Sequence, residues 1–272
     1  MCTLIIGRDV LGPGSLLVGA NRDEDPARAA EAPARLSGEP HVVGGRDTRG
    51  GGTWFAIRDA RRVVALLNRR GAPPASSPAP RSRGLLTLDV ACAAPAAPPA
   101  LADARFESEA LTAALSAVST SPHAPFTLVC ATPAGGWVLA HDGQRPAAPR
   151  AIEPGWHVVT HGEFDDPREP RTVRLARKLA DFRPRNPAEA ETRVLELLSL
   201  HGSFGDGAPP AAGEPDAGAA LADRAAVCIH DGRMVTVSTS LFRLSRAGSR
   251  FIHIEGRPCT TPPRDMSPLL AD

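Results

Sequence analysis

Leu16-Leu17-Val18-Gly19-Ala20-Asn21-Arg22-Asp23-Glu24 (residues 16–24) is an apolar run that ends in four consecutive polar residues. An apolar run of this length predicts a core strand, and alternation along a strand places Asn21 and Asp23 on one face and Arg22 and Glu24 on the other. Four polar side chains at the end of a buried strand are costly to bury unless they pair or serve a site. We therefore interpret them as the edge of a functional site, with a solvated turn held by internal salt bridges as the alternative.

Short apolar, β-branched runs of the same kind recur on both sides of this segment. Each is bounded by Gly, Pro, Asp or Arg, which is typical of antiparallel strands, and Gly135-Gly136 predicts a hairpin turn. The expected strands are Thr3–Gly7, Ser15–Ala20, His41–Val43, Thr53–Ile57, Arg62–Leu67, Phe126–Ala131, Trp137–His141, Trp156–Thr160, Ala226–His230, Met234–Thr239 and Arg250–Glu255.

Helical periodicity appears between these runs of strands. It predicts helices over Leu85–Cys92, Phe106–Val118, Glu169–Phe182 and Pro187–His201, the last with an Asn186 cap. Because strands and helices come in runs and do not alternate strictly, we expect an α+β fold in which helices cover two packed antiparallel sheets. We expect a single domain over residues 1–272, with loops near 72–80 and 205–220.

Composition excludes several classes of protein. The formal charge of the 272 residues is +1, which supplies no basic field for nucleic acid, and 42% hydrophobic content is too apolar for a disordered chain. The five cysteines contain no C-x-x-C pair, so a reducing compartment is expected and a metal site is not. No apolar stretch is long enough to span a membrane and no secretory leader is recognisable, which together favour a cytoplasmic protein.

Cys2 follows the initiator methionine directly. Removal of Met1 would leave a thiol and a free α-amine on one residue. The amine titrates near 7.7–8.0 and the thiol near 8.5, so the amine can relay the thiol proton at neutral pH. The alternative is that a cysteine at this position is incidental.

Other residues at strand ends complete a candidate site. Asp23 would hold or orient a protonated amine, and Arg22 would favour the thiolate. Gly50-Gly51-Gly52 permits a close backbone approach or a positive φ. Asn68, at the end of the strand Arg62–Leu67, would donate its amide to a developing oxyanion, or alternatively cap a turn.

Five short motifs follow one another in order over about the first 70 residues. They are Cys2, Asn21-Arg22-Asp23-Glu24, Gly45-Arg46-Asp47, Gly51-Gly52-Thr53-Trp54 and Leu67-Asn68-Arg69. Together they resemble the NRDE family, whose eukaryotic members are called transport and Golgi organisation protein 2. That family is similar to N-terminal nucleophile hydrolases of the choloylglycine and penicillin acylase type, so the resemblance implies a four-layer αββα sandwich.

The same resemblance implies roles for individual residues. Cys2 would be the nucleophile, Asp23 would orient its α-amine and Asn68 would help to form the oxyanion hole. Arg224 would lie beside the thiol. The implied chemistry is hydrolysis of a small non-peptide amide through a thioester.

The chain also departs from the pattern of the hydrolases. Their early arginine stands three residues before the aspartate, where this chain has Ala20, and Arg22 is instead adjacent to Asp23. His161 occupies the position of a second asparagine that assists the oxyanion, and it would donate a hydrogen bond with a different reach.

A second function from another class uses the same cleft. Relatives have been proposed to move haem or to influence acyl-lipid handling, so a non-catalytic carrier is the alternative to an amidase. Haem ligation requires an accessible His, Cys, Met or Tyr, for which histidines such as His157 and His161 are candidates. We expect a small-molecule partner and no resident cofactor, and the oligomeric state stays open.

Overall fold

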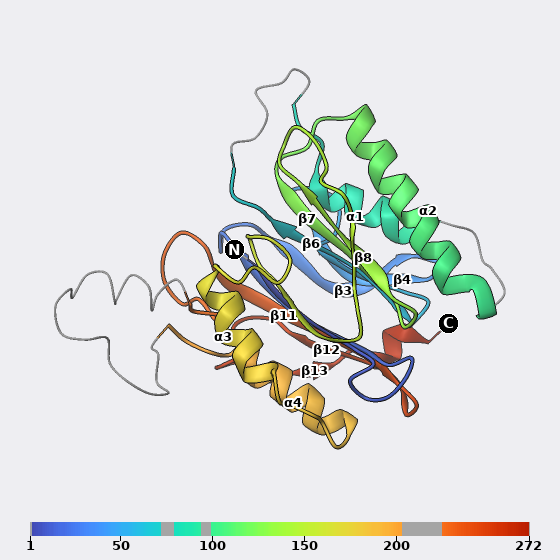
Figure 1. The fold of residues 1–272 in the computed structure, drawn as a ribbon. Helices are drawn as coiled ribbons and strands as arrows, with labels where there is room; N and C mark the ends of the chain where they lie inside the picture. The colour runs from blue at the N-terminus through green and yellow to red at the C-terminus, as the bar shows by residue number, and fades with distance from the viewer. Residues whose placement is uncertain (1, 72–78, 94–98, 203–224, 272) are drawn as a thin grey trace.

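A computed structural model describes residues 2–71, 79–93, 99–202 and 225–271, and two antiparallel β-sheets form its centre (Figure 1). The strands are β1 Thr3–Arg8, β2 Leu16–Glu24, β3 Ala30–Ser37, β4 Val42–Asp47, β5 Phe55–Arg58, β6 Arg62–Asn68, β7 Phe126–Ala131, β8 Gly136–His141, β9 Arg150–Ala151, β10 Gly155–Val159, β11 Val235–Ser245, β12 Gly248–Ile254 and β13 Arg264–Asp265. The six-stranded sheet has the order β10-β1-β2-β11-β12-β13, and the seven-stranded sheet has the order β3-β4-β5-β6-β7-β8-β9.

Alternating apolar side chains bury both faces of each sheet. In β1, Leu4 and Ile6 pack between the sheets, whereas Ile5 points to the opposite face. In β6, Val63 packs between the sheets and Val64 faces outward into a separate cluster. Each such side chain stabilises the fold by roughly 1.5–3 kcal/mol when fully buried. Sheets that are apolar on both faces need a further layer on each outer side.

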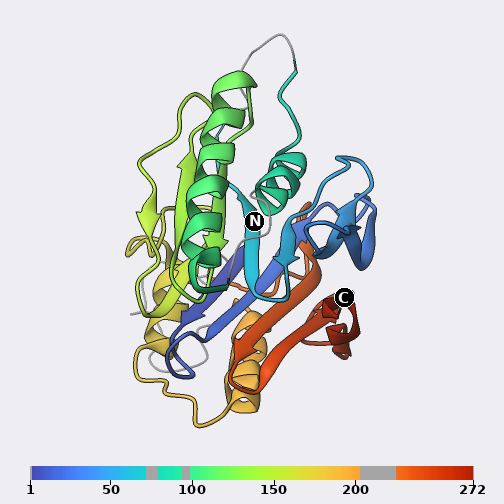
Figure 2. The same ribbon diagram turned by 90° about the vertical axis from the view of Figure 1, so that its right-hand side faces the viewer.

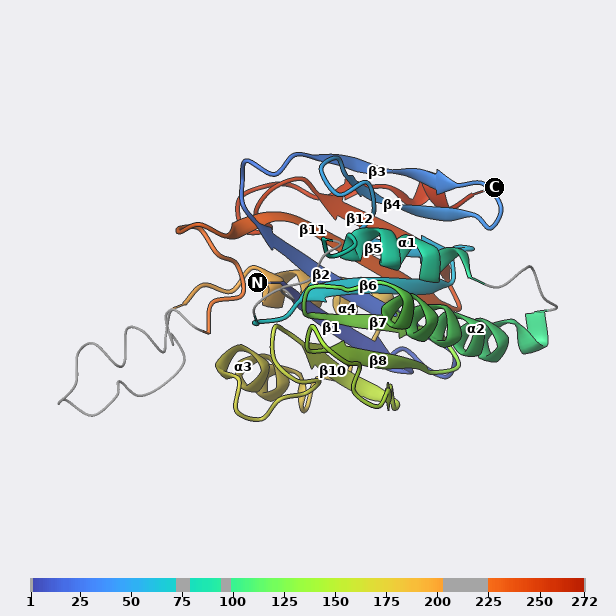
Figure 3. The same ribbon diagram turned by 90° about the horizontal axis from the view of Figure 1, so that it is seen from above.

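Two pairs of helices supply those outer layers. The helices α1 (Arg83–Cys92) and α2 (Pro99–Thr120) cover the seven-stranded sheet, and α3 (Pro170–Leu179) and α4 (Pro187–Leu198) cover the six-stranded sheet. The two pairs remain apart when the molecule is turned (Figure 2), and from above α1 and α2 lie in front of the strands with α4 behind them (Figure 3). A short helix, η1 (Ser267–Leu270), follows β13. The expected αββα sandwich is thereby confirmed.

Several local expectations match the structure closely. The strand β7 has the predicted bounds, and it pairs with β8 in the expected hairpin. The Asn186 side chain accepts a hydrogen bond from the Glu189 amide at 2.9 Å, so α4 begins at Pro187 as predicted. Within the described ranges, no helix combines the length and the apolarity needed to cross a bilayer.

Other local expectations differ from the structure: for example, the helix expected over Glu169–Phe182 ends at Leu179, and the helix expected from Phe106 begins at Pro99. The sequence does not signal β3, because it is an edge strand whose side chains are mostly exposed and which contains Pro33. Ala226–His230 is not a strand, since the amides of Val227 and Cys228 both donate to the Leu200 carbonyl, at 2.9 Å each, instead of to a ladder. The helix α4 ends at Leu198 and not at His201.

Two other expectations fall on parts of the chain that are not described. The loop expected at 205–220 lies entirely outside the described residues, as does most of the loop expected at 72–80. A single domain over residues 1–272 stays a prediction.

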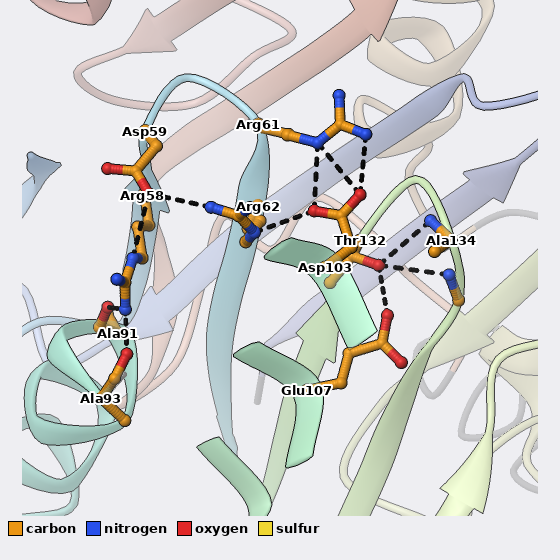
Figure 4. A network of polar contacts seen from close by, with 11 residues as sticks. Arg58, Asp59, Arg61, Arg62, Ala91, Ala93, Asp103, Glu107, Thr132 and Ala134 are labelled. Atoms are coloured by element: carbon orange, nitrogen blue, oxygen red, sulfur yellow. Dashed lines mark hydrogen bonds and ion pairs between the residues drawn. The ribbon is translucent and has the colours of Figure 1, made fainter. Parts of the chain in front are cut away.

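Arginine–carboxylate contacts join the turn between β5 and β6 to the helices above it (Figure 4). Arg61 and Arg62 both contact the Asp103 carboxylate of α2, at 2.7 and 2.9 Å. Arg58 donates from Nη1 to the Ala91 carbonyl at 3.1 Å, near the end of α1. The carboxyl-terminal end of α1 is therefore anchored to the seven-stranded sheet.

Candidate active site

A cavity of about 330 Å³ opens where the ends of β2 and β6 meet the turn after β4 and the start of α1. Cys2, which directly precedes β1, forms part of its wall. The other lining residues are Arg22, Glu24, Arg28, Asp47, Arg49, Gly50, Thr53, Trp54, Leu66, Asn68, Pro80, Arg81, Ser82, Arg83, Gly84 and Ala124. A separate cavity of about 400 Å³ beside Trp156 and Phe182 contains none of the predicted site residues.

The Cys2 side chain is 8% exposed and lies at the boundary between the inter-sheet core and the cavity. Its Sγ contacts the Asp23 carbonyl oxygen at 3.9 Å. Burial raises the pKa of the Cys2 thiol above its ordinary value, and the negative charges of Asp23 and Glu24 raise it further. These effects oppose formation of a thiolate at Cys2, so a reaction at this sulfur needs a base to accept its proton.

The Asp23 carboxylate is fully buried and held from two sides. Thr236 Oγ1 donates to Asp23 Oδ1 at 2.7 Å, and Arg171 Nη1 lies 3.5 Å from Oδ2. Arg171 also donates to Thr3 Oγ1 at 2.8 Å. Burial raises the pKa of Asp23, while Arg171 and Thr236 oppose that rise. A register shift in β11 between Thr236 and Ser238, opposite the end of β2, marks a β-bulge of the kind found beside active sites.

The two faces expected for the polar end of β2 are present. On the face toward α4, Asn21 Nδ2 donates to the carbonyl oxygens of Leu198 and Val227, at 2.8 and 3.0 Å. Its Oδ1 accepts from Thr239 Oγ1 at 2.7 Å. Asn21 is thus committed to holding β2 against its neighbours, and the reactive chemistry must come from other residues.

On the opposite face, Arg22 joins the early motifs into one cluster. Its guanidinium lies 4.2 Å from the centre of the Trp54 ring and 3.6 Å from the Asp47 carboxylate. Asp47 also accepts from Arg28 Nε at 2.8 Å. Burial lowers the pKa of Arg22, and Asp47 opposes that change. Arg22 therefore contributes a positive charge to the cavity wall, and Trp54 and Asp47 hold its guanidinium in position.

The glycines before β5 permit a close approach of two backbones. Gly51 has a positive φ of 74°, and a Cβ at Gly52 would lie 1.9 Å from the Gly84 carbonyl carbon. The Thr53 amide donates to the Gly84 carbonyl at 3.0 Å. The start of α1, with Arg83, therefore lies directly against this turn and faces the cavity.

The remaining predicted residues lie in different places. Asn68 ends β6 and lines the cavity, and within the described ranges its side-chain amide makes no hydrogen bond. His161 follows β10 and is not among the lining residues; burial and the charge of Arg70 lower its pKa to about 4, so its ring is neutral. Arg224 lies outside the described residues.

Sequence reasoning missed two residues that contact Asp23. Arg171 stands on the buried side of α3 with Leu175 and Leu179, so a charged residue within that apolar stripe was the available signal. Thr236 carried no signal, because its contact with Asp23 depends on a strand pairing between residues 213 positions apart.

Comparison with known proteins gives consistent similarities. The sequence pattern of the family described as Transport and Golgi organisation 2 matches residues 1–204. Transport and Golgi organization protein 2 of Drosophila melanogaster is 39% identical over 87 residues, which are 29% of this chain and 29% of that protein.

Two solved structures are also similar. A Caenorhabditis elegans N-acylethanolamine-hydrolyzing acid amidase ortholog is 16% identical, with a TM-score of 0.45 over 88% of this chain and 92% of that one. The C2A mutant of conjugated bile acid hydrolase from Clostridium perfringens is 12% identical, with a TM-score of 0.48 over 100% of this chain and 95% of that one.

Proposed function

The chain belongs to the Transport and Golgi organisation 2 family, and from that premise we propose that it is an amidohydrolase whose nucleophile is Cys2 after removal of Met1. The substrate is a small non-peptide amide. The observation that carries the proposal is the position of the Cys2 sulfur, at the wall of a 330 Å³ cavity and in contact with the main chain of the buried Asp23.

The proposed reaction uses the α-amine of Cys2 as its base. Burial favours the protonated thiol, so the amine accepts the thiol proton as sulfur attacks the amide carbon, and it then gives that proton to the departing nitrogen. Asp23 orients the amine. Asn68, whose amide is not committed elsewhere in the described part of the chain, donates to the developing oxyanion. Water then hydrolyses the thioester and releases the acid.

The charge of the cavity wall indicates an anionic substrate. Five arginines line the cavity against two carboxylates, Glu24 and Asp47. Asp47 is already shared between Arg22 and Arg28. Burial lowers the pKa of Arg83, and the charge of Arg28 lowers it further, as crowded cations require. A carboxylate or phosphate group on the substrate would relieve this crowding through charge-assisted hydrogen bonds.

Intact mass spectrometry and a burst experiment test the proposal together. The mass should show that Met1 has been removed, and an activated amide bearing a carboxylate should release a burst of product. Cys2→Ala should abolish the burst, and Asn68→Ala should slow acylation by roughly 10²–10³-fold. Cys92→Ala, a matched control outside the cavity, should leave the burst unchanged. Retention of Met1 would block the amine as an amide and end the catalytic proposal.

A non-catalytic carrier of haem or acyl lipid is the second candidate. The same arginines would hold the carboxylates of such a ligand. Among the described residues that line the cavity, Cys2 is the one side chain of a type that ligates haem iron. A haemin titration should therefore give a saturable spectral shift that Cys2→Ala removes. If the shift is absent, haem is no longer a candidate.

A further inference from the structure

Four side chains that the proposed reaction does not use converge away from the cavity. They are His201, Cys228, His230 and Cys259, and their ligand atoms all lie within 4.8 Å of one another. The two sulfurs are 3.5 Å apart, and His230 Nε2 lies 3.1 Å from Cys259 Sγ and 3.7 Å from Cys228 Sγ. The rings of His201 and His230 meet edge to face, with centroids 4.8 Å apart.

The sulfur–sulfur separation of 3.5 Å and the His230–Cys228 separation of 3.7 Å match the edges of a metal tetrahedron, the His230–Cys259 separation of 3.1 Å is slightly shorter, and the His201 nitrogen lies within 4.8 Å of the other ligand atoms. Zinc binds thiolate sulfur at about 2.3 Å and imidazole nitrogen at about 2.0–2.1 Å, so tetrahedral ligand atoms stand about 3.3–3.8 Å apart. A disulfide would bring the sulfurs to about 2.05 Å instead. Two cysteines and two histidines form a donor set that is typical of tetrahedral zinc. We propose that His201, Cys228, His230 and Cys259 bind one zinc ion.

Hydrogen bonds made by Arg257 hold the backbone that carries two of the four ligands, His230 and Cys259. Arg257 Nη2 donates to the His230 carbonyl at 3.0 Å, and the Arg257 carbonyl accepts from the amides of Thr260 and Thr261, at 3.1 and 2.9 Å. This turn places Cys259 against His230. Four protein ligands leave no open coordination position, so the zinc is structural and does not activate water.

The zinc ion fixes residues 227–230, which hydrogen-bond to the strands beside the cavity. The Leu200 carbonyl holds the amides of Val227 and Cys228, and the Val227 carbonyl accepts from Asn21 of β2. The Ile229 amide donates to Thr236 Oγ1, at 3.0 Å, and Thr236 in turn donates to Asp23. The metal thus braces residues 227–230 against β2 and β11. The site stands without the hydrolase proposal, because none of its ligands takes part in that reaction.

Metal analysis of the purified full chain tests the proposal directly. We expect about one zinc ion per chain, and after its removal cobalt(II) should restore a stoichiometric complex with thiolate charge-transfer bands and the strong visible bands of tetrahedral cobalt. Cys259→Ser should lose both, whereas the matched Cys92→Ser, another partly buried cysteine, should retain both. A strong chelator should lower the melting temperature of the wild type and of Cys92→Ser.

A second variant covers the case in which Cys259→Ser fails to fold. His201 is exposed, so His201→Ala should fold and bind cobalt on the order of tenfold or more weakly than the wild type. Two results would overturn the proposal. One is a protein that takes up neither zinc nor cobalt in tetrahedral form, and the other is a Cys228–Cys259 disulfide, visible as a mass two hydrogens lower that a reductant restores.

Discussion

Replacing Arg171 by methionine should reveal how much the fold depends on the charge pair behind the cavity. The Arg171 side chain is 1% exposed and that of Asp23 is 0% exposed, and Nη1 lies 3.5 Å from Oδ2. The change leaves a buried carboxylate without this cation and also removes the hydrogen bond to Thr3 Oγ1. We expect a loss of about 3–5 kcal/mol in the free energy of unfolding at pH 7.

The sign of the pH dependence follows from the carboxylate that remains. Arg171 opposes the rise that burial imposes on the pKa of Asp23, so its removal raises that pKa further. A carboxyl group with a raised native pKa is destabilising when charged, and the penalty disappears as the pH falls through that pKa. The deficit of Arg171→Met relative to the wild type should therefore shrink on acidification.

Urea unfolding followed by circular dichroism measures these differences. The matched control is Arg177→Met, an exposed position on the same helix, which should change stability by less than about 0.5 kcal/mol. Combining Arg171→Met with Asp23→Asn removes both charges, so the double variant should lose much less than the sum of the two single variants. A loss below about 1 kcal/mol in Arg171→Met, or additive single variants, would refute the role assigned to this pair.

Two further predictions test the turn beside α1 and the response to acid. Gly52→Ala should cost roughly 1–3 kcal/mol or more in urea unfolding, because its Cβ would lie 1.9 Å from the Gly84 backbone; Gly38→Ala, in open space, should cost little, and equal costs would contradict the packing argument. Burial, with the charge of Arg264, lowers the pKa of His253 to about 4, so below pH 6.5 the unfolded chain binds a proton that the native chain does not. The free energy of unfolding should therefore fall by roughly 3 kcal/mol between pH 6.5 and pH 4 because of His253. His253→Gln should weaken this pH dependence, and an unchanged pH dependence would refute the contribution assigned to His253.

Local periodicity accounts for much of the fold. The bounds of β7 and the faces of the polar residues in β2 follow from alternation along a strand, which each segment carries within itself. The start of α4 is equally local, since Asn186 caps the helix three residues ahead. Edge strand β3 escaped prediction because exposed side chains leave no periodic apolar signal.

The candidate site was likewise predicted in part from the sequence and in part seen only in the structure. The motif order singled out Cys2, Asp23 and Asn68, and the fold brings Cys2 and Asn68 to the same cavity. In contrast, the contacts of Asp23 with Arg171 and Thr236, and the four-residue cluster, were identified from the tertiary structure. Without a C-x-x-C pair, the sequence predicted no metal site, and the spacing Cys228-x-His230 was the one local hint.

The sequence by itself was therefore sufficient for most of the strands, for the two packed sheets and for Cys2 as the candidate nucleophile, because alternation and motif order operate over neighbouring residues. Which charge neutralises the buried Asp23, and which four side chains meet at the proposed zinc site, depended on folding. These contacts join residues that stand far apart along the chain, so they exist after the sheets and helices have packed and no short segment can encode them alone.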